Sequence, residues 1–476
     1  MNRIPRAIIV FVLVISGVTL VGNRLFAQKV DINGGGGYSS LASTGNDLPF
    51  WFTHNQHGKY TLQGNTYQLM EASLNGTKHF KNSYFLDVGF HAVSGYSKKI
   101  TSHFNQLYAA GGNKWVAVKF GYFSDEEELG GLSSSNGSII RTINSRPYPK
   151  IRFETNGYLP VWFWENHFFI KAEYDEGVLN GERIIELPHL HHKLLAFQFK
   201  GNSSFQLSAG LNHYVFWGGN SPVFGHLPDK FSDYLLYVTG KSGDSEFLET
   251  DQVNVAGNQL GDYFLEVKKV FGKGEVELYI SHPFEDHSGM ELDNYKDNLY
   301  GIGYFSNNKD ALINGIVAEI LYTKHQSGYA HIVTGPKELR VRGRDNYFNH
   351  GIYSSGFTYM EMAMCSPLFY PVTTEESGKV TGFENTRIIA YHLGISGSLS
   401  PDLSWKSFIT FTNNFGTYSM PYSPPKKQVY SLAGIYYTSK NRKNEFSLEI
   451  SSDKGQLTPN KSGLKFSYSF CFPAGK

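Results

Sequence analysis

A repeating alternation of apolar and polar side chains constrains this chain more than any other feature of its sequence. In the last stretch of this kind, five large apolar side chains stand at every second position: Leu464, Phe466, Tyr468, Phe470 and Phe472. About 16 to 18 such stretches, each of about ten residues, follow one another along the chain. A period of two places alternate side chains on opposite faces of a β-strand, and about ten residues are what a tilted strand needs to cross a bilayer.

This pattern predicts an all-β fold, a transmembrane antiparallel β-barrel of about 18 strands. No apolar run after residue 27 approaches the ~20 residues of a membrane-spanning helix, and lipid offers the backbone no hydrogen bonds, so the strands need a closed barrel. The composition agrees, because 15% aromatic residues and 50 glycines with only 18% charged residues suit a large antiparallel β protein. A soluble sheet that buries one face of each strand is the alternative.

The connections between the predicted strands alternate in length. Short polar connections are expected at residues 201–204, 271–274, 306–310, 397–402 and 438–444, and long ones at residues 213–232, 240–261, 282–298, 324–351 and 413–427. Short periplasmic turns and long outer loops are typical of outer-membrane barrels. The chain is therefore expected in the bacterial outer membrane.

In one region, counting strands from the two sides gives inconsistent strand directions. Phe357, Tyr359 and Glu361 alternate with Thr358 and the methionines that follow, which predicts a strand at residues 357–364. Counting forward, the strand at residues 316–323 ends outside, and counting back from a periplasmic C-terminus, the strand at 357–364 ends outside as well. Either an odd number of strands lies within residues 324–386, or part of this region folds inward. The sequence leaves both open.

The N-terminal residues differ from the rest of the chain. Arg3 and Arg6 precede an apolar run at residues 7–21, and Ala27 offers a small residue for cleavage, so residues 1–27 are expected to be a signal peptide. Residues 28–65 alternate poorly, and Pro49 fixes a bend. We expect a periplasmic or lumenal plug segment at residues 28–65, followed by the barrel at residues 66–476.

Charge and motifs exclude several classes of function. The 43 basic and 42 acidic residues give a net charge of +1, which does not favour a nucleic-acid partner. No nucleophile elbow, phosphate-binding loop or zinc-protease motif occurs, so no catalytic residue, cofactor or metal site is predicted. The two cysteines, Cys365 and Cys471, do not form a disulfide framework.

One stretch, residues 337–369, carries side chains that suit carbohydrate. Sugar rings stack on aromatic side chains, sugar hydroxyls pair with Asn, Asp and Arg, and uronic acid carboxylates pair with arginine. The candidate polysaccharide-binding residues there are Arg340, Arg342, Arg344, Asp345, Asn346, Tyr347 and Asn349. Candidates from other connections are Arg141, Arg146, Trp217 and Asn220. The alternative is that these residues brace loops inside a polar lumen.

Several stretches resemble the capsule assembly Wzi family of bacterial outer-membrane proteins. They are LPFW, which begins at Leu48 and leads to Asn55 and Gly58; GLSSSNGSIIRTINSRPYPKIRF within residues 115–153; WGGNSPVFGHLPDKFSDYLLYVTGKSGDS from Trp217; and GRDNYFNHGIYSSGFTYMEMAMCSPLF from Gly343. The last is the most specific. The resemblance implies an 18-stranded barrel with a periplasmic helical element that acts as a lectin and helps to attach capsular polysaccharide.

The resulting hypothesis is a non-catalytic, lectin-like barrel that binds capsular or other surface polysaccharide. Its partners would be that polysaccharide, outer-membrane lipid and, as a further candidate, the polysaccharide-export machinery. Two alternatives remain open: a porin or glycan-export channel, and an outer-membrane barrel enzyme that acts on lipid or glycan.

Overall fold

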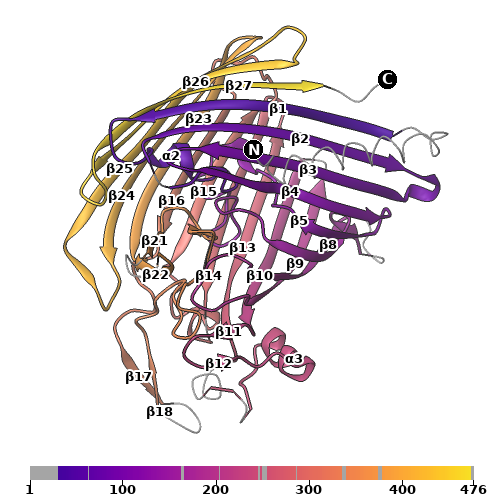
Figure 1. Cartoon of the computed structure of the whole chain (residues 1–476). Coiled ribbons are helices and arrows are strands. Elements are labelled where there is room, and N and C mark those ends of the chain that lie inside the picture. The colour runs from indigo at the N-terminus through magenta and orange to yellow at the C-terminus, as the bar shows by residue number, and fades with distance from the viewer. Residues whose placement is uncertain are drawn as a thin grey trace, which may run out of the picture.

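In the computed structural model, the chain forms one barrel whose wall curves round a lumen (Figure 1). The structure describes residues 30–472 except residues 63, 162–165, 203, 245–246, 249–254, 286, 335–338 and 374–377. The predicted signal peptide, residues 1–27, lies outside the described residues. Within the part of the chain that is described, no helix is long and apolar enough to cross a membrane.

The wall is a closed ring of 18 antiparallel strands, which confirms the predicted fold class. Each strand pairs with its neighbours in the ring, and the ring closes where the first strand pairs with the last. Two short pieces, β6 and β7, both pair with β8, so they form one interrupted wall strand. The wall strands are β1 (Val30–Ser43), β2 (Thr66–His79), β3 (Phe85–Tyr96), β4 (Ile100–Gly112), β5 (Val116–Tyr122), β6 (Pro149–Thr155) with β7 (Leu159–Pro160), β8 (Phe168–Val178), β9 (His189–Asn202), β10 (Phe205–Trp217), β13 (Asn258–Phe271), β14 (Gly274–Phe284), β15 (Asn298–Ser306), β16 (Gly315–Tyr322), β23 (Ile388–Ser400), β24 (Leu403–Gly416), β25 (Pro421–Thr438), β26 (Asn444–Gly455) and β27 (Lys461–Phe472).

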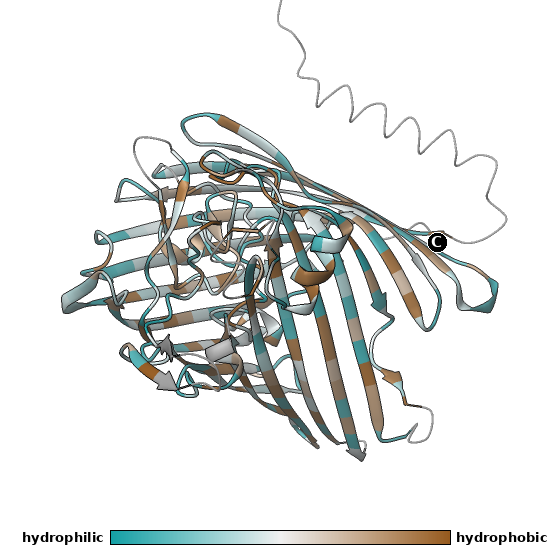
Figure 2. Ribbon diagram, turned by 90° about the horizontal axis from the view of Figure 1, so that it is seen from below, coloured by the Kyte–Doolittle hydropathy of each residue, from teal (hydrophilic) through white to brown (hydrophobic). Residues whose placement is uncertain are grey.

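The two faces of the wall differ as the alternation predicts. Side chains such as Leu464 and Phe466 on β27 are about half exposed, because they point away from the lumen. Inward side chains such as Asp262 and Glu319 are polar and almost fully buried. Figure 2 shows hydrophilic and hydrophobic residues alternating along the wall strands. An apolar belt therefore surrounds a polar inner face.

The predicted plug segment at residues 28–65 is wrong in its first part, because β1 is a wall strand. Gly34 pairs with Phe472 and Gly37 pairs with Ser469 across the seam between β1 and β27. A Cβ on Gly35 would lie 2.4 Å from the carbonyl oxygen of Phe470, so the seam has no room for a side chain there. Four successive glycines carry no side-chain alternation, which is why the sequence hid this strand.

The rest of that segment, residues 44–65, turns into the lumen. Its short helix α2 (Phe50–Thr53) is buried, and the backbone N–H of Phe50 donates to the Asp453 carboxylate on β26 at 3.0 Å. The Phe50 ring stacks on Tyr430 of β25 with centroids 4.3 Å apart, and Trp51 packs on Phe408 of β24. Three neighbouring wall strands therefore hold this segment.

The two ends of the barrel differ, as the connection lengths predict. Short turns at residues 80–84, 113–115, 272–273, 401–402 and 439–443 lie at the end that also holds both described termini, which we call the turn end. The long connections, residues 123–148, 179–188, 218–257, 285–297 and 323–387, lie at the opposite end, the loop end. The expected long loop at 413–427 is instead mostly strand, since Asn413 pairs with Lys427.

The loop-end connections contain the remaining short elements. These are the 3₁₀ turn Leu129–Gly131, β11 (Asn220–Ser221), β12 (Gly225–His226), α3 (Phe231–Thr239), α5 (His287–Met290), β17 (His331–Thr334), β18 (Leu339–Arg342), β19 (Thr358–Tyr359), β20 (Met362–Ala363), β21 (Tyr370–Thr373) and β22 (Val380–Asn385), while the 3₁₀ turn Lys81–Ser83 lies at the turn end. In Figure 1, α3, β11–β12 and β17–β18 gather at the lower end.

The inward-folding alternative resolves the strand count. Because β16 pairs directly with β23, residues 323–387 form a single loop-end connection whose short strands pair with one another. The predicted strand at 357–364 is wrong. Thr358 pairs with Ala363 in a tight hairpin whose central residues, Met360 and Glu361, have φ of 49° and 66°. Two positive φ values are typical of a type I′ turn. Both faces of the hairpin are buried, so its alternation did not mark a wall strand.

Candidate binding site at the loop end

Residues 123–148 cross the whole width of the lumen. They leave the wall at β5 and rejoin it at β6, yet His392 on β23 donates through Nε2 to the carbonyl oxygen of Leu132 at 2.8 Å. The hydroxyls of Ser133 and Ser134 donate to Glu319 on β16 at 2.5 and 2.6 Å. In the ring of 18 strands, β16 is eight strands beyond β5, close to diametrically opposite. This connection therefore spans the barrel like a crossbar.

The other inward segments join the crossbar. Asn144 donates to the carbonyl oxygen of Ala363 at 2.9 Å, and Thr142 donates to that of Met364 at 3.0 Å, which ties residues 323–387 to it. Asn55 from the α2 segment donates to the carbonyl oxygen of Ser134 at 2.8 Å. Three separate connections thus meet within the lumen at the loop end.

Arg141, a candidate binding residue, is occupied by carboxylates of its own chain. Its guanidinium donates to Asp125 at 2.8 and 2.9 Å and to Glu173 of β8 at 2.9 Å. Arg152 of β6 also donates to Asp125, at 3.0 Å, and makes a bidentate pair with Asp175 at 2.7 Å. Burial opposes ionisation of Asp125, but the two arginines outweigh it and hold the pKa of this carboxyl well below its usual range. Arg141 braces the crossbar.

The cluster at residues 340–349 is divided between the surface and the interior. Arg340 and Arg342 lie on β18, whose backbone pairs with Val333 and His331 of β17. Arg344 and Asn346 follow it and are exposed. The backbone N–H of Arg344 donates to the carbonyl oxygen of Gly328 at 2.8 Å. Arg344 and Asn346 can therefore meet a ligand at the loop end.

The other members of the cluster have internal partners. Asp345 accepts a hydrogen bond from the hydroxyl of Ser327 at 2.5 Å. Tyr347 is 1% exposed and donates to the Asp297 carboxylate at 2.7 Å. The Asn349 amide donates to the carbonyl oxygen of Phe383 at 2.9 Å and accepts from its N–H at 2.7 Å. Tyr347 and Asn349 therefore anchor the connection rather than face a ligand.

No contact among the described residues places Trp217 or Asn220 beside the arginine cluster. Trp217 is 9% exposed and its indole stacks on His189 with centroids 4.3 Å apart, beneath α3. Asn220 is exposed, pairs through its backbone with Glu186, and its side-chain oxygen lies 3.0 Å from Nδ1 of His226. Trp217 packs within its own chain in this structure, and its stacking on sugar stays a prediction.

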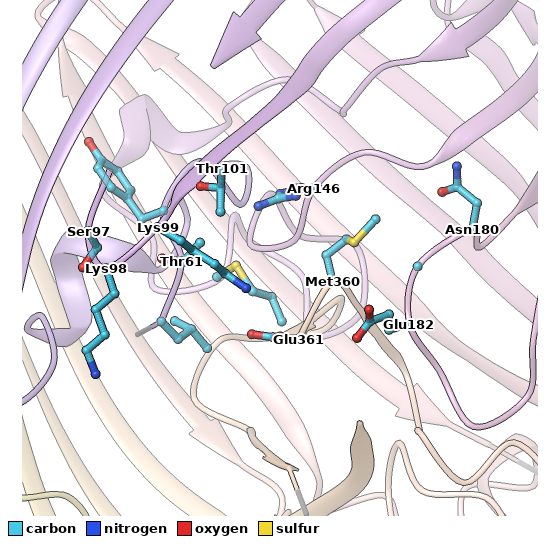
Figure 3. Close-up of a pocket in the computed structure, with 14 residues that line it drawn as sticks. Thr61, Ser97, Lys98, Lys99, Thr101, Arg146, Asn180, Glu182, Met360 and Glu361 are labelled. Carbon is cyan, nitrogen blue, oxygen red and sulfur yellow. The ribbon is translucent and has the colours of Figure 1, made fainter. Parts of the chain in front are cut away.

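A cavity of about 370 Å³ opens among five of the connections at the loop end (Figure 3). Its lining combines cations, carboxylates, an amide and large side chains: Tyr60, Lys98, Lys99, Arg146, Asn180, Glu182, Met360 and Glu361. Of the candidates named from the sequence, Arg146 lies here, and its Nε donates to the carbonyl oxygen of Gly58 at 3.1 Å. Burial lowers the pKa of this guanidinium from its ordinary value. Figure 3 shows Lys99, Arg146, Met360, Glu182 and Glu361 gathered round one space.

Most of these lining residues were missed by the sequence analysis. The signal that was available is Lys98–Lys99, two successive cations at the tip of the hairpin between β3 and β4. Glu182 and Glu361 are about 180 positions apart in sequence and meet because residues 179–188 and the β19–β20 hairpin both fold toward the lumen. A single sequence carries no sign of that meeting.

Comparison with known structures identifies the architecture. Wzi of Escherichia coli, an outer-membrane protein involved in group 1 capsule assembly and a carbohydrate-binding β-barrel, matches with a TM-score of 0.56 and 14% sequence identity over 96% of this chain and 88% of that chain. Pseudomonas aeruginosa OccK5 (OpdH) matches with a TM-score of 0.49 and 9% identity over 94% and 99%. No protein-family model and no curated protein matches the sequence.

The chain is an outer-membrane β-barrel. In such barrels the short turns face the periplasm and the long loops face outward, so the turn end is periplasmic and the cavity opens on the cell surface. The resemblance to the Wzi family also implied a periplasmic helical element. The described helices α2, α3 and α5 all belong to loop-end connections, so that element is not found among the described residues.

Proposed function

We propose that this outer-membrane β-barrel binds acidic surface polysaccharide at its loop end, without catalysis, and helps to hold or assemble that polysaccharide at the cell surface. The observation that carries the proposal is the cavity on the extracellular side that contains both Lys99 and Arg146. Its volume of about 370 Å³ lies in the range of small-molecule sites, ~300–1,000 Å³. A site of this size takes a short stretch of a polymer and leaves the rest of it outside.

The lining matches the chemistry of an acidic sugar. Lys99 and Arg146 supply cations for a uronate carboxylate, and charge-assisted hydrogen bonds of this kind are among the stronger ones. The Asn180 amide and the Glu361 carboxylate can pair with sugar hydroxyls. Arg344, which does not line the cavity, is a separate exposed cation of the loop end.

The crossbar supports this proposal over a porin or export channel. Residues 123–148 span the lumen and are joined there by two further connections, so the path along the barrel axis is narrowed at the loop end. We expect purified protein in a planar bilayer to show no steady single-channel conductance. Large, stable conductance steps would favour the channel instead.

Two carboxylates line the cavity, and such a pair also suits an enzyme that hydrolyses glycans. Glu182 and Glu361 both line it, and hydrolysis of a glycosidic bond needs a pair of acids that flank the bond. We expect prolonged incubation with polysaccharide to release no new reducing ends. If ends appear and are lost in E182Q or E361Q, the barrel is a hydrolase.

Retention of purified polysaccharide on immobilised protein tests the binding proposal. The variant K99Q/R146Q should weaken retention of a uronate-bearing polysaccharide about tenfold, the equivalent of ~1.4 kcal/mol, and leave a neutral polysaccharide unaffected. K99Q alone serves as a second variant, since Arg146 also bonds to Gly58. The matched control is K440Q/R442Q, two exposed cations in the periplasmic turn 439–443. Equal retention by all variants at low salt would refute the cavity as the site.

A further inference from the structure

Helix α3 packs against the outside of the barrel wall. On β9, the inward side chain His192 lies 3.2 Å from Asn212, whereas its neighbour His191 points outward and packs against Tyr234 of α3. On β10, Phe216 faces the lumen and contacts Phe357, while Val215 and Trp217 face outward and are buried with Tyr237 of α3. The helix therefore covers the outward faces of β9 and β10 at their loop-end ends (Figure 1).

The helix sits where the outward face of the wall changes from apolar to polar. On β9, Leu195 and Phe197 are outward and 43% and 54% exposed, as lipid-facing residues are. Nearer the loop end, the outward residues are His191 and Lys193. The Lys193 ammonium donates to the carbonyl oxygen of Val238 in α3, and His191 lies 2.7 Å from Glu176. α3 thus shields polar wall residues immediately above the apolar belt.

The exposed side chains of α3 include two large apolar ones, together with Ser232 and Thr239. Phe231 is 75% exposed and Leu235, one helical turn later, is 47% exposed. Tyr234 packs on Trp217 with centroids 5.0 Å apart and forms a hydrogen bond with the hydroxyl of Tyr174 on β8. The group resembles the girdle of aromatic residues that outer-membrane barrels place at the level of the lipid headgroups.

We propose that α3 is a membrane-interface helix, whose Phe231 and Leu235 insert into the outer leaflet at the boundary between acyl chains and headgroups. The occupant is lipid because α3 covers the wall immediately beyond the lipid-facing residues Leu195 and Phe197 of β9 and itself exposes Phe231 and Leu235. An amphipathic helix buries its apolar face to a depth of about 5–10 Å at this boundary. α3 thereby extends the lipid-contacting surface of the barrel on one side. This inference rests on the outer-membrane location and is independent of polysaccharide binding.

Site-specific labelling of the full-length chain tests the inference. Cys471 is exposed and is replaced by serine, whereas Cys365 is buried and stays unlabelled. A cysteine at position 235 (L235C) carries an environment-sensitive fluorophore in proteoliposomes whose lipids bear a nitroxide on the acyl chain near the headgroup. The matched control is I332C on the β17–β18 hairpin, where Ile332 is 69% exposed.

The label at position 235 should lose most of its fluorescence to the lipid nitroxide, and the label at 332 should lose little. If both labels are quenched equally, or if the label at 235 responds to a water-soluble quencher instead, α3 does not contact lipid and the inference is overturned. Energy transfer between two differently labelled populations at position 235, without quenching by lipid, would assign the surface to a second copy of the chain and would also overturn it.

Discussion

The two large connections that fold into the lumen are held in place by different kinds of interaction. The crossbar, residues 123–148, is fixed by charge: Asp125 lies between Arg141 and Arg152, and Glu319 accepts from two serines. The connection 323–387 contains no such arginine–carboxylate network among the described residues; it is held by aromatic packing and by hydrogen bonds, which include those from the buried Arg183 guanidinium to the carbonyl oxygens of Gly356 and Thr358. Phe348 packs on Phe369 with ring centroids 4.8 Å apart, and Tyr347 donates to Asp297.

Two buried carboxyls show what this difference means. Arginines lower the pKa of Asp125, so its ionised form stabilises the crossbar. At Asp297, burial dominates and raises the pKa from 3.8 to about 6, although the hydroxyl of Tyr347 and the backbone N–H groups of Gln326 and His325 oppose the rise. Nearby Asp345 adds to it. The crossbar is held by ion pairs, whereas the second connection is anchored on a carboxyl, Asp297, whose protonation changes near pH 6, and its Arg344 is exposed.

The largest effect is expected from removing a cation of the crossbar network. R152M leaves Asp175 buried without its bidentate partner and removes one of the two arginines from Asp125, and breaking a buried ion pair costs about 3–5 kcal/mol. Guanidinium unfolding followed by tryptophan fluorescence measures this loss. R344M, at an exposed arginine of the second connection, should change the free energy of unfolding by less than ~0.5 kcal/mol. Equal effects of the two variants would remove the contrast between the connections.

Asp297 should make the fold more stable in mild acid. Because its pKa is higher in the folded chain, at about 6, than its ordinary 3.8, the folded state binds the proton more tightly. The gain is complete below about pH 4 and is lost as the pH rises through 6, and it amounts to about 3 kcal/mol. The difference in unfolding free energy between wild type and D297N, followed from pH 4 to pH 7, measures it. For D125N the difference should have the opposite sign, and parallel curves for wild type and D297N would contradict the prediction.

A smaller effect is expected at the junction of the two connections. Asn144 donates to Ala363 and accepts from the backbone N–H of Asn55 at 3.0 Å. N144A leaves the buried carbonyl oxygen of Ala363 unpaired, at about 1–3 kcal/mol, while the N–H of Asn55 is only part-buried. Faster proteolysis within residues 323–387 of folded N144A, at unchanged heat-modifiable migration of the barrel, would show that the crossbar holds the second connection in place. T142V, which removes the contact to Met364, should act in the same direction.

The smallest effect is expected at Arg342 and Arg344, at the end of β18 and just after it. R342A/R344A should weaken retention of acidic polysaccharide about two- to fivefold, since exposed ion pairs contribute about 0.2–1 kcal/mol each. Retention at low salt, compared with R442A in the periplasmic turn, measures it. Unchanged retention would assign Arg342 and Arg344 a structural role and leave binding to the cavity.

The strands of the wall were predictable from the sequence because each of them separates lipid from a polar lumen. Lipid outside and polar contacts inside require alternation, and strands such as β27 show it plainly. The rule failed at Gly34 to Gly37, which have no side chains to alternate, and at residues 357–364, which alternate although both faces are buried. Alternation of apolar and polar side chains marks a wall strand only where one face of the strand meets lipid and the other meets polar groups.

The candidate site was predictable only in part. Arg146 and the exposed Arg344 remain candidates, whereas Arg141, Tyr347 and Trp217 are held by their own chain. An arginine that binds a ligand and one that braces a loop are alike in sequence, since their partners are set by tertiary structure. The cavity is built from five connections that are far apart in sequence, so its lining could not be assembled from local motifs.

The seam between β1 and β27 also decides when the barrel can form. Gly34 and Phe472 lie near opposite ends of the sequence, and closing so long a loop is the entropically slowest kind of contact to make. Until β27 pairs, β1 and β26 remain unpaired edges, and each is a template for strands of other chains. The glycines of β1 leave room for the aromatic rings of β27, so the pairing that closes the ring also covers the two edges that strands of neighbouring molecules could join.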